Sequence, residues 1–190
     1  DGVPDFVEIG NGTNPNSPTD AVDSDGDGLS DYYEARNTAP TNIAISATTV
    51  NENNTAGASI ADVTATDVNI GEAFTYALIA GTGDTDNASF TIAGSSLKAV
   101  NAFDFETKTS YSLRLKVTDK GGLSYEKEFV ITVADINEAP ETLVLTGASV
   151  AENTASGATA GTLSATDPDA NSTFTYALVS GTGSTDNASF

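Results

Sequence analysis

The feature that most constrains the fold of this chain is an internal repeat with a period of 100 residues. Three segments recur at this spacing: FTYAL (74–78 and 174–178), TDNASF (85–90 and 185–190) and ATD (65–67 and 165–167). A fixed period of this kind indicates tandem copies of one structural unit. We therefore expect three parts: an Asp-rich segment at 1–40, a complete repeat at 41–138, and the first half of a second repeat at 139–190.

Both ends of the sequence fall inside a unit, so we expect the chain to be a segment of a longer tandem-repeat protein. Half a repeat cannot close its own core. The remaining strands of the second repeat are therefore expected either from the following part of the chain or from a neighbouring copy.

Strand patterns dominate the complete repeat. The segment YSLRLKVTD alternates apolar residues at 111, 113, 115 and 117 with polar ones, which is the period of a half-buried strand. Seven short strands are expected, separated by Gly, Asn and Asp turns: NIAISATTV, ASIADVTATD, AFTYALIAG, SFTIAG, SLKAV, YSLRLKVTD and EFVITVAD. We therefore predict an all-β fold, a Greek-key seven-stranded β-sandwich.

The composition excludes several classes of function. Acidic residues number 27 against 7 basic ones, so the net charge of -20 repels nucleic-acid phosphates and anionic membrane surfaces and favours cations as partners. Because Cys, His, Met and Trp are absent, the chain has no disulfide, no imidazole ligand and no Ser/His/Asp triad. The apolar runs are too short for membrane insertion. We do not expect an enzyme.

The segment DSDGDGLSDYYE at 23–34 matches the calcium-loop pattern, with carboxylates at loop positions 1, 3, 5, 9 and 12 and glycine at position 6. Calcium takes six to eight oxygen ligands, which this spacing offers on one wrapped chain. The expected ligands are Asp23, Asp25, Asp27, the Leu29 carbonyl, Asp31 and Glu34. The alternative is a solvated acidic turn. Such loops fill reliably where calcium is millimolar, so we expect an extracellular or cell-surface location.

Residues 41–190 resemble cadherin repeats of the bacterial type. The resemblance rests on these segments: NEN (51–53), ATD (65–67), FDFET (103–107), VTDKGGLS (117–124), DINEAP (135–140) and ATDPDAN (165–171). Residues 1–40 resemble the calcium repeats of the thrombospondin type 3 or dockerin kind. The cadherin resemblance implies Ca²⁺ ions bound where successive repeats join.

The resemblance also implies particular ligands at two junctions. For the junction at 135–140 they are Glu52, Asp104, Glu106, Asn137, Glu138, Asp167, Asp169 and Asn171. For the junction before the complete repeat they are Asn37, Asp67, Asn69 and Asp119, and one ion at most is expected because Thr38 and Gly71 replace two family ligands. The alternative is that these residues form turns and solvated rim charges that never converge.

These expectations favour a calcium-rigidified structural segment of a large secreted or cell-surface bacterial repeat protein, such as an adhesin stalk or an extracellular fibre. Its partners would be calcium and neighbouring repeats or copies of itself. One alternative is a calcium-dependent carbohydrate-binding module that uses Tyr32, Tyr33 and Tyr125 to contact a polysaccharide. Another is a filament subunit whose half-repeat is completed by a neighbouring chain.

Overall fold

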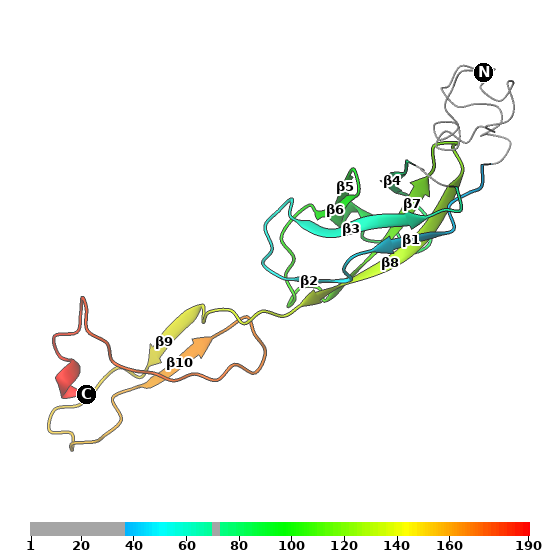
Figure 1. The fold of residues 1–190 in the computed structure, drawn as a ribbon. Helices are drawn as coiled ribbons and strands as arrows, with labels where there is room; N and C mark the ends of the chain where they lie inside the picture. The colour runs from blue at the N-terminus through cyan, green and yellow to red at the C-terminus, as the bar shows by residue number, and fades with distance from the viewer. Residues whose placement is uncertain (1–36, 70–72) are drawn as a thin grey trace, which may run out of the picture. The chain divides into compact units, whose positions relative to one another are not determined.

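The computed structural model describes residues 37–69 and 73–190, which form two compact units divided between Asp135 and Ile136 (Figure 1). The calcium loop predicted at 23–34 and the substitution at Gly71 lie outside the described residues. We use the name complete repeat for the described residues of the N-terminal unit (37–69 and 73–135), and the name half-repeat for the C-terminal unit (136–190). Each unit is described by itself.

The complete repeat is a sandwich of two four-stranded sheets, as the alternating sequence pattern predicts (Figure 1). The first sheet has the order β1-β3-β6-β5, and all its neighbours are antiparallel. Its strands are β1 (Asn42–Ile45), β3 (Ser59–Thr66), β6 (Ser96–Ala99) and β5 (Phe90–Ala93), with a 3₁₀ turn, η1 (Asn87–Ser89), before β5.

The second sheet has the order β2-β8-β7-β4. Its strands are β2 (Thr49–Asn51), β8 (Ser124–Ala134), β7 (Ser110–Thr118) and β4 (Thr75–Leu78). Strands β7 and β8 form a long antiparallel hairpin, whereas β2 runs parallel to β8. The chain crosses between the sheets after β1, β2, β3, β4 and β6, which produces the predicted Greek-key arrangement.

The first predicted strand, NIAISATTV, divides between the two sheets. Its first part, β1, pairs with β3, and its last part, β2, pairs with β8. The change of sheet falls at 46–48, where the backbone N–H of Ser46 still bonds to the first sheet and the carbonyl of Thr48 already bonds to Thr132 in the second. The seven expected strands therefore appear as eight, and one chain segment joins both sheets at their edges.

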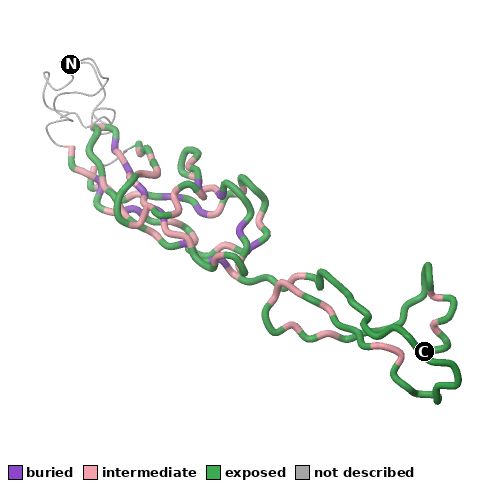
Figure 2. Tube along the Cα trace, turned by 180° about the vertical axis from the view of Figure 1, so that it is seen from behind, coloured by how far each residue is buried: buried purple, intermediate pink, exposed green. Residues whose placement is uncertain are grey.

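The core lies between the sheets and follows the predicted alternation. Leu113, Leu115 and Val117 of β7 are fully buried, and Ile131 and Val133 of the neighbouring strand β8 are buried on the same face of the sheet. From the first sheet, Ile43, Val63 and Leu97 complete the core. Phe90, Phe103 and Tyr111 form an aromatic cluster, with ring centroids 4.5–6.1 Å apart. Figure 2 shows this run of buried residues along the N-terminal unit.

The lysine Lys127 connects the edge of the first sheet to the second. Its Nζ donates to Asn42 Oδ1 and to the Ile43 carbonyl, both at 2.9 Å, and lies over the Phe129 ring. Because β1 is an edge strand, the Ile43 carbonyl could otherwise accept a hydrogen bond from another strand, and Lys127 prevents this by donating to it.

The half-repeat forms a single antiparallel pair, β9 (Thr142–Thr146) and β10 (Thr162–Thr166), and a 3₁₀ turn, η2 (Asn187–Ser189). No residue from 136 to 190 is buried (Figure 2). None of the helices in the described part of the chain has the length and apolar character needed to cross a membrane.

Candidate metal sites in the complete repeat

The parallel pairing of β2 with β8 brings two acidic residues together at one end of the sandwich. In this register Val50 lies opposite Val133 and Asn51 opposite Ala134, so Glu52 and Asp135 follow as neighbours. The backbone N–H of Glu52 continues the pairing by donating to the Ala134 carbonyl at 3.1 Å. Both carboxylates therefore extend the inward-facing rows of their strands past the end of the core.

The loop at 103–107 brings a third carboxylate to this end. Its backbone is fixed by hydrogen bonds from the Phe103 N–H to Asn54 Oδ1 and from the Phe105 N–H to Glu52 Oε2, both 2.8 Å, and by the Asn53 N–H donating to the Phe103 carbonyl. Asn53 adopts the left-handed backbone conformation, with φ 55°. Glu106 follows directly and lies beside Glu52.

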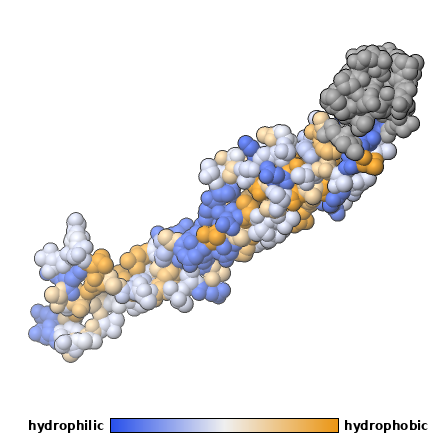
Figure 3. Space-filling model, viewed as in Figure 1, coloured by the Kyte–Doolittle hydropathy of each residue, from blue (hydrophilic) through white to orange (hydrophobic). Residues whose placement is uncertain are grey.

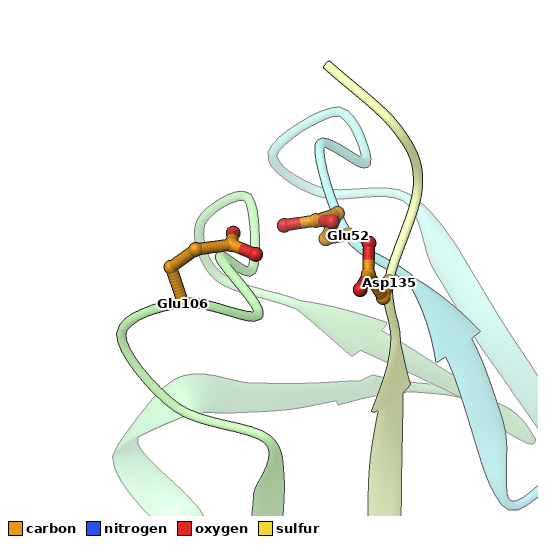
Figure 4. A group of neighbouring side chains, drawn as sticks. All are labelled: Glu52, Glu106 and Asp135. Carbon is orange, nitrogen blue, oxygen red and sulfur yellow. The ribbon is translucent and has the colours of Figure 1, made fainter. Parts of the chain in front are cut away.

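Carboxylate oxygens of Glu52, Glu106 and Asp135 all lie within 4.8 Å of one another, and Figure 4 shows the three side chains converging from three separate segments. We name these three residues the exit cluster. Glu52 is only 4% exposed, whereas Glu106 and Asp135 are exposed to solvent. The arrangement combines a rigid, buried oxygen donor with two donors that can adjust.

Three negative charges at this separation repel one another. At 4.8 Å each pair costs about 1 kcal/mol in water and about 3 kcal/mol at the effective dielectric found near protein surfaces. A divalent cation converts that repulsion into attraction. Three carboxylates can offer up to six oxygens, which matches the hard, oxygen-rich coordination that calcium requires.

At the opposite end of the sandwich, the structure brings together the four residues predicted for the first junction. Asn37 Nδ2 donates to Asp119 Oδ2 at 3.0 Å, and the Leu123 N–H donates to Asp119 Oδ1 at 2.8 Å. Asp119 is 5% exposed. Gly121 permits this approach, because a Cβ at that position would lie 2.3 Å from Asn37 Nδ2.

The second half of this group is joined through Thr38. Its backbone N–H and its hydroxyl both donate to Asn69 Oδ1, at 3.0 and 2.8 Å, and the Asn69 N–H donates to Asp67 Oδ1 at 2.8 Å. Two buried oxygens, Asn37 Oδ1 and Asp67 Oδ2, have no hydrogen-bond partner among the residues that the structure describes. We name Asn37, Asp67, Asn69 and Asp119 the entry cluster. It has two carboxylates and two amide oxygens, so its charge is lower than that of the exit cluster.

Five of the residues predicted for the junction at 135–140 belong to the C-terminal unit. There the Glu138 N–H donates to Asp169 Oδ2 at 2.7 Å, and the Asp169 N–H donates to Asp167 Oδ1 at 3.0 Å. This pattern repeats the one made by Thr38, Asn69 and Asp67, with Glu138 in place of Thr38 and Asp169 in place of Asn69. Asn137 donates to the Glu138 carbonyl, and Asn171 adopts φ 65°.

Asp104, another predicted ligand, makes local hydrogen bonds. Its two carboxylate oxygens accept from the backbone N–H and the hydroxyl of Thr107, both at 2.8 Å. The carboxylate thereby closes the turn that holds Glu106.

Sequence reasoning missed Asp135 as a candidate ligand. A usable signal was present, since Ile131, Val133 and residue 135 share one parity along β8 and the first two face the core. Tyr125, proposed for sugar contact, instead packs against the core. The other two tyrosines of that hypothesis, Tyr32 and Tyr33, lie outside the described residues.

Comparison with known proteins supports the fold. No protein-family model matches the chain. Over 136 residues the chain is 29% identical to mouse Protocadherin Fat 4 and 31% identical to human Protocadherin Fat 4, a region that covers 70% of this chain but only 3% of either relative. The crystal structure of human Protocadherin-24 EC1-2 superposes with a TM-score of 0.53 at 22% identity, covering 70% of this chain and 61% of that one. The complete repeat therefore has the fold of a cadherin-like domain.

Proposed function

We propose that the complete repeat is a calcium-rigidified structural module of a secreted or cell-surface repeat protein, of the adhesin-stalk or extracellular-fibre kind. The observation that carries this proposal is the exit cluster, where oxygens of Glu52, Glu106 and Asp135 lie within 4.8 Å of one another. The resemblance of residues 41–190 to bacterial cadherin repeats supports a bacterial surface protein as the parent.

The position of the exit cluster explains how an ion would stiffen the protein. Asp135 is the last residue of the N-terminal unit and follows β8 directly. An ion held by Asp135 and by the buried Glu52 restrains the direction in which the chain leaves the sandwich. Without the ion, repulsion among the three carboxylates favours their separation, so the exit segment moves more freely.

The entry cluster is proposed as a second, weaker site. Its unsatisfied Asn37 and Asp67 oxygens are suited to a cation, and it has fewer charges to attract one. The loop at 23–34, and Asp104, Asn137, Glu138, Asp167, Asp169 and Asn171, stay proposed as further ligands. The repeat limits at 41–138 and 139–190 are likewise proposed.

The proposal is tested by titrating the metal-free chain with calcium, using calorimetry for binding and thermal denaturation for stability. We expect binding in the range of extracellular calcium and a melting temperature that rises with calcium concentration, because an ion bound only to the folded state stabilises it. Small-angle X-ray scattering in calcium and in chelator should give a longer maximum dimension with calcium. If calcium produces neither binding nor any change in dimension, the proposed function is wrong.

A further inference from the structure

The turn between β2 and β3 lies against the loop that carries Glu106. At one end of the turn the Glu52 N–H donates to the Ala134 carbonyl at 3.1 Å. At the other end the Gly57 N–H donates to the Ala99 carbonyl at 2.9 Å. Since Ala134 belongs to β8 and Ala99 to β6, the turn is attached to both sheets. Figure 3 shows hydrophilic residues gathered on the viewed surface at this end of the N-terminal unit, so the turn provides a fixed support for a polar site.

Within this turn, the half-buried Asn54 reaches the loop with its side chain. Its Oδ1 accepts a hydrogen bond from the Phe103 N–H at 2.8 Å, and its Nδ2 donates to the Thr55 carbonyl at 3.2 Å. Both ends of the amide are engaged, and its orientation follows from these two partners. Asn54 therefore connects the turn to the start of the loop in one defined geometry.

Phe103, the residue bound by Asn54, is anchored in the core. It is only 3% exposed, and its ring centroid lies 5.8 Å from that of Phe90 and 4.5 Å from that of Tyr111. Its backbone N–H lies beside this packed cluster and needs a partner, because an unpaired buried donor is costly. The bond to Asn54 supplies that partner, and the loop begins at a rigid point three residues before Glu106.

Alternate backbone N–H groups of the loop are held by side-chain oxygens. The N–H of residue 103 donates to Asn54, that of residue 105 to Glu52, and that of residue 107 to Asp104. Glu52 belongs to the exit cluster, and Asp104 belongs to the loop itself. Of these three acceptors, Asn54 alone comes from outside both groups. Its bond therefore restrains the loop without taking a charge from the cluster.

Such a restraint affects how well an ion is bound. Repulsion among the carboxylates of the exit cluster favours an outward displacement of the loop while no ion is bound. The Asn54 bond opposes that displacement and keeps Glu106 within 4.8 Å of Glu52 and Asp135. A donor that is already in place loses less conformational freedom when the ion binds, so the affinity is higher.

We propose that Asn54 is a positioning residue of the exit cluster. By accepting from the Phe103 N–H, it holds the 103–107 loop so that Glu106 is placed for a divalent cation before the cation binds. Asn54 acts through Glu106. This inference rests on the proposed function, because it concerns the affinity of that same site for calcium.

Two substitutions of Asn54 test the proposal. Asn54→Ala removes the acceptor. Asn54→Thr introduces the residue that the half-repeat has at the corresponding position, where the Thr154 hydroxyl donates to the local Ala151 carbonyl within its own turn. The threonine variant is thus expected to keep the turn and to lose the bond to the Phe103 N–H.

Calcium affinity is measured by NMR titration of the native and variant chains, with the Glu106 and Asp135 amides as reporters of the exit cluster. Both Asn54 variants should bind calcium about tenfold more weakly, the effect typical of residues that orient a metal ligand. Circular dichroism in chelator confirms that each variant is folded at the temperature used. Asn101→Ala, at an exposed position just before the same loop, is the matched control and should leave the affinity unchanged.

Hydrogen exchange provides a readout that does not depend on the ion. In chelator, the Phe103 amide should exchange slowly in the native chain and faster in Asn54→Ala. The Leu123 amide, which donates to Asp119 at the opposite end of the sandwich, should exchange at the same rate in both.

The possible outcomes separate this inference from the proposed function. If the native chain binds calcium at the exit cluster and the folded Asn54 variants bind it as tightly, this inference is overturned and the proposed function stands. If the native chain binds no calcium, both are overturned. Fast exchange of the native Phe103 amide, or an equal loss of affinity in Asn101→Ala, would also overturn the role of Asn54.

Discussion

Glu52 accepts a hydrogen bond from the backbone N–H of Phe105 through Oε2 at 2.8 Å, so one buried carboxylate ties the end of β2 to the loop before β7. This bond fixes Glu52 as a preformed oxygen donor whether or not an ion is present. Glu106 comes from the same loop but is exposed. A substitution at Glu52 therefore affects both folding and ion binding, whereas one at Glu106 separates the two.

We predict that Glu106→Gln lowers calcium affinity about tenfold or more, because one charged donor of the exit cluster is lost. Its melting temperature in chelator should equal or exceed that of the native protein, since the substitution also removes repulsion. Calorimetry and thermal denaturation measure the two effects. Glu141→Gln, an exposed change outside both clusters, is the control. Unchanged affinity in Glu106→Gln would exclude the exit cluster as the site.

Gly121→Ala should destabilise the metal-free protein by about 1.5–3 kcal/mol, the range for one hydrogen bond to a charged group. The new Cβ would lie 2.3 Å from Asn37 Nδ2 and displace it from Asp119. Chemical denaturation measures the change. In a double-mutant cycle with Asn37→Ala, Gly121→Ala should cost little more, because the contact is already gone. Additive losses would show that the glycine acts through another contact.

Acid should weaken the interactions of the Asp86 carboxylate with Lys108 and with the Ser112 N–H. Burial alone would raise the pKa of this carboxyl, but hydrogen bonds from Lys108 and the Ser112 N–H, with the charge of Lys108, hold it below its ordinary value of 3.8. A lowered pKa in the folded state gives stability that is complete above the unfolded value and is lost as the pH falls through the folded value. The affected window is therefore below about pH 4.

Asp86→Asn should reduce the free energy of unfolding at neutral pH by about 1.5–3 kcal/mol, the range for hydrogen bonds to a charged group. It should also flatten the pH dependence of stability on the acid side. Both effects are measured by denaturant titrations at pH values from about 2 to about 7, which bracket the ordinary pKa of a carboxyl group. Asp62→Asn, at an exposed position, serves as control. An acid limb as steep in Asp86→Asn as in the native protein would contradict the assignment.

Equivalent positions of the two repeats should respond differently to truncation. Ile43→Ala should cost about 2–5 kcal/mol, because it empties a fully buried site. Leu143→Ala removes a side chain that is 68% exposed and should change the free energy of unfolding by less than about 0.5 kcal/mol. Denaturant unfolding measures the pair. A large loss of unfolding free energy in Leu143→Ala would show that the Leu143 side chain is buried in solution.

The sequence predicted the parts of the fold that depend on local alternation. The alternation at Leu113, Leu115 and Val117 matches their complete burial. The sequence did not predict that NIAISATTV divides between the two sheets, because both halves of this segment have strand character. The change of sheet depends on the hydrogen bond from the Thr132 N–H to the Thr48 carbonyl, and these two residues are distant in sequence. Periodicity describes one strand at a time and contains no information on its partner.

The same reason limits what the sequence reveals about the candidate sites. Glu52 and Glu106 are expected ligands that the structure brings together, while Asp135 joins them through the parallel register of β2 and β8. The hydrogen bonds from Thr107 to the Asp104 carboxylate were likewise not predicted from the sequence. Both differences arise from backbone geometry that residue type alone does not encode.

The parallel pairing of β2 with β8 also has a mechanical consequence. Tension between the two ends of the complete repeat pulls β2 towards its N-terminus and β8 towards its C-terminus, so the two strands are loaded in shear and their hydrogen bonds must break together. Breaking the hydrogen bonds one at a time would need less force, but strands loaded in shear do not separate in this way. Single-molecule stretching should find a high unfolding force for the native repeat and a much lower one when Val50→Pro removes the pairing of β2. In the surface stalk proposed above, the pairing of β2 with β8 would resist the pulling force within this repeat.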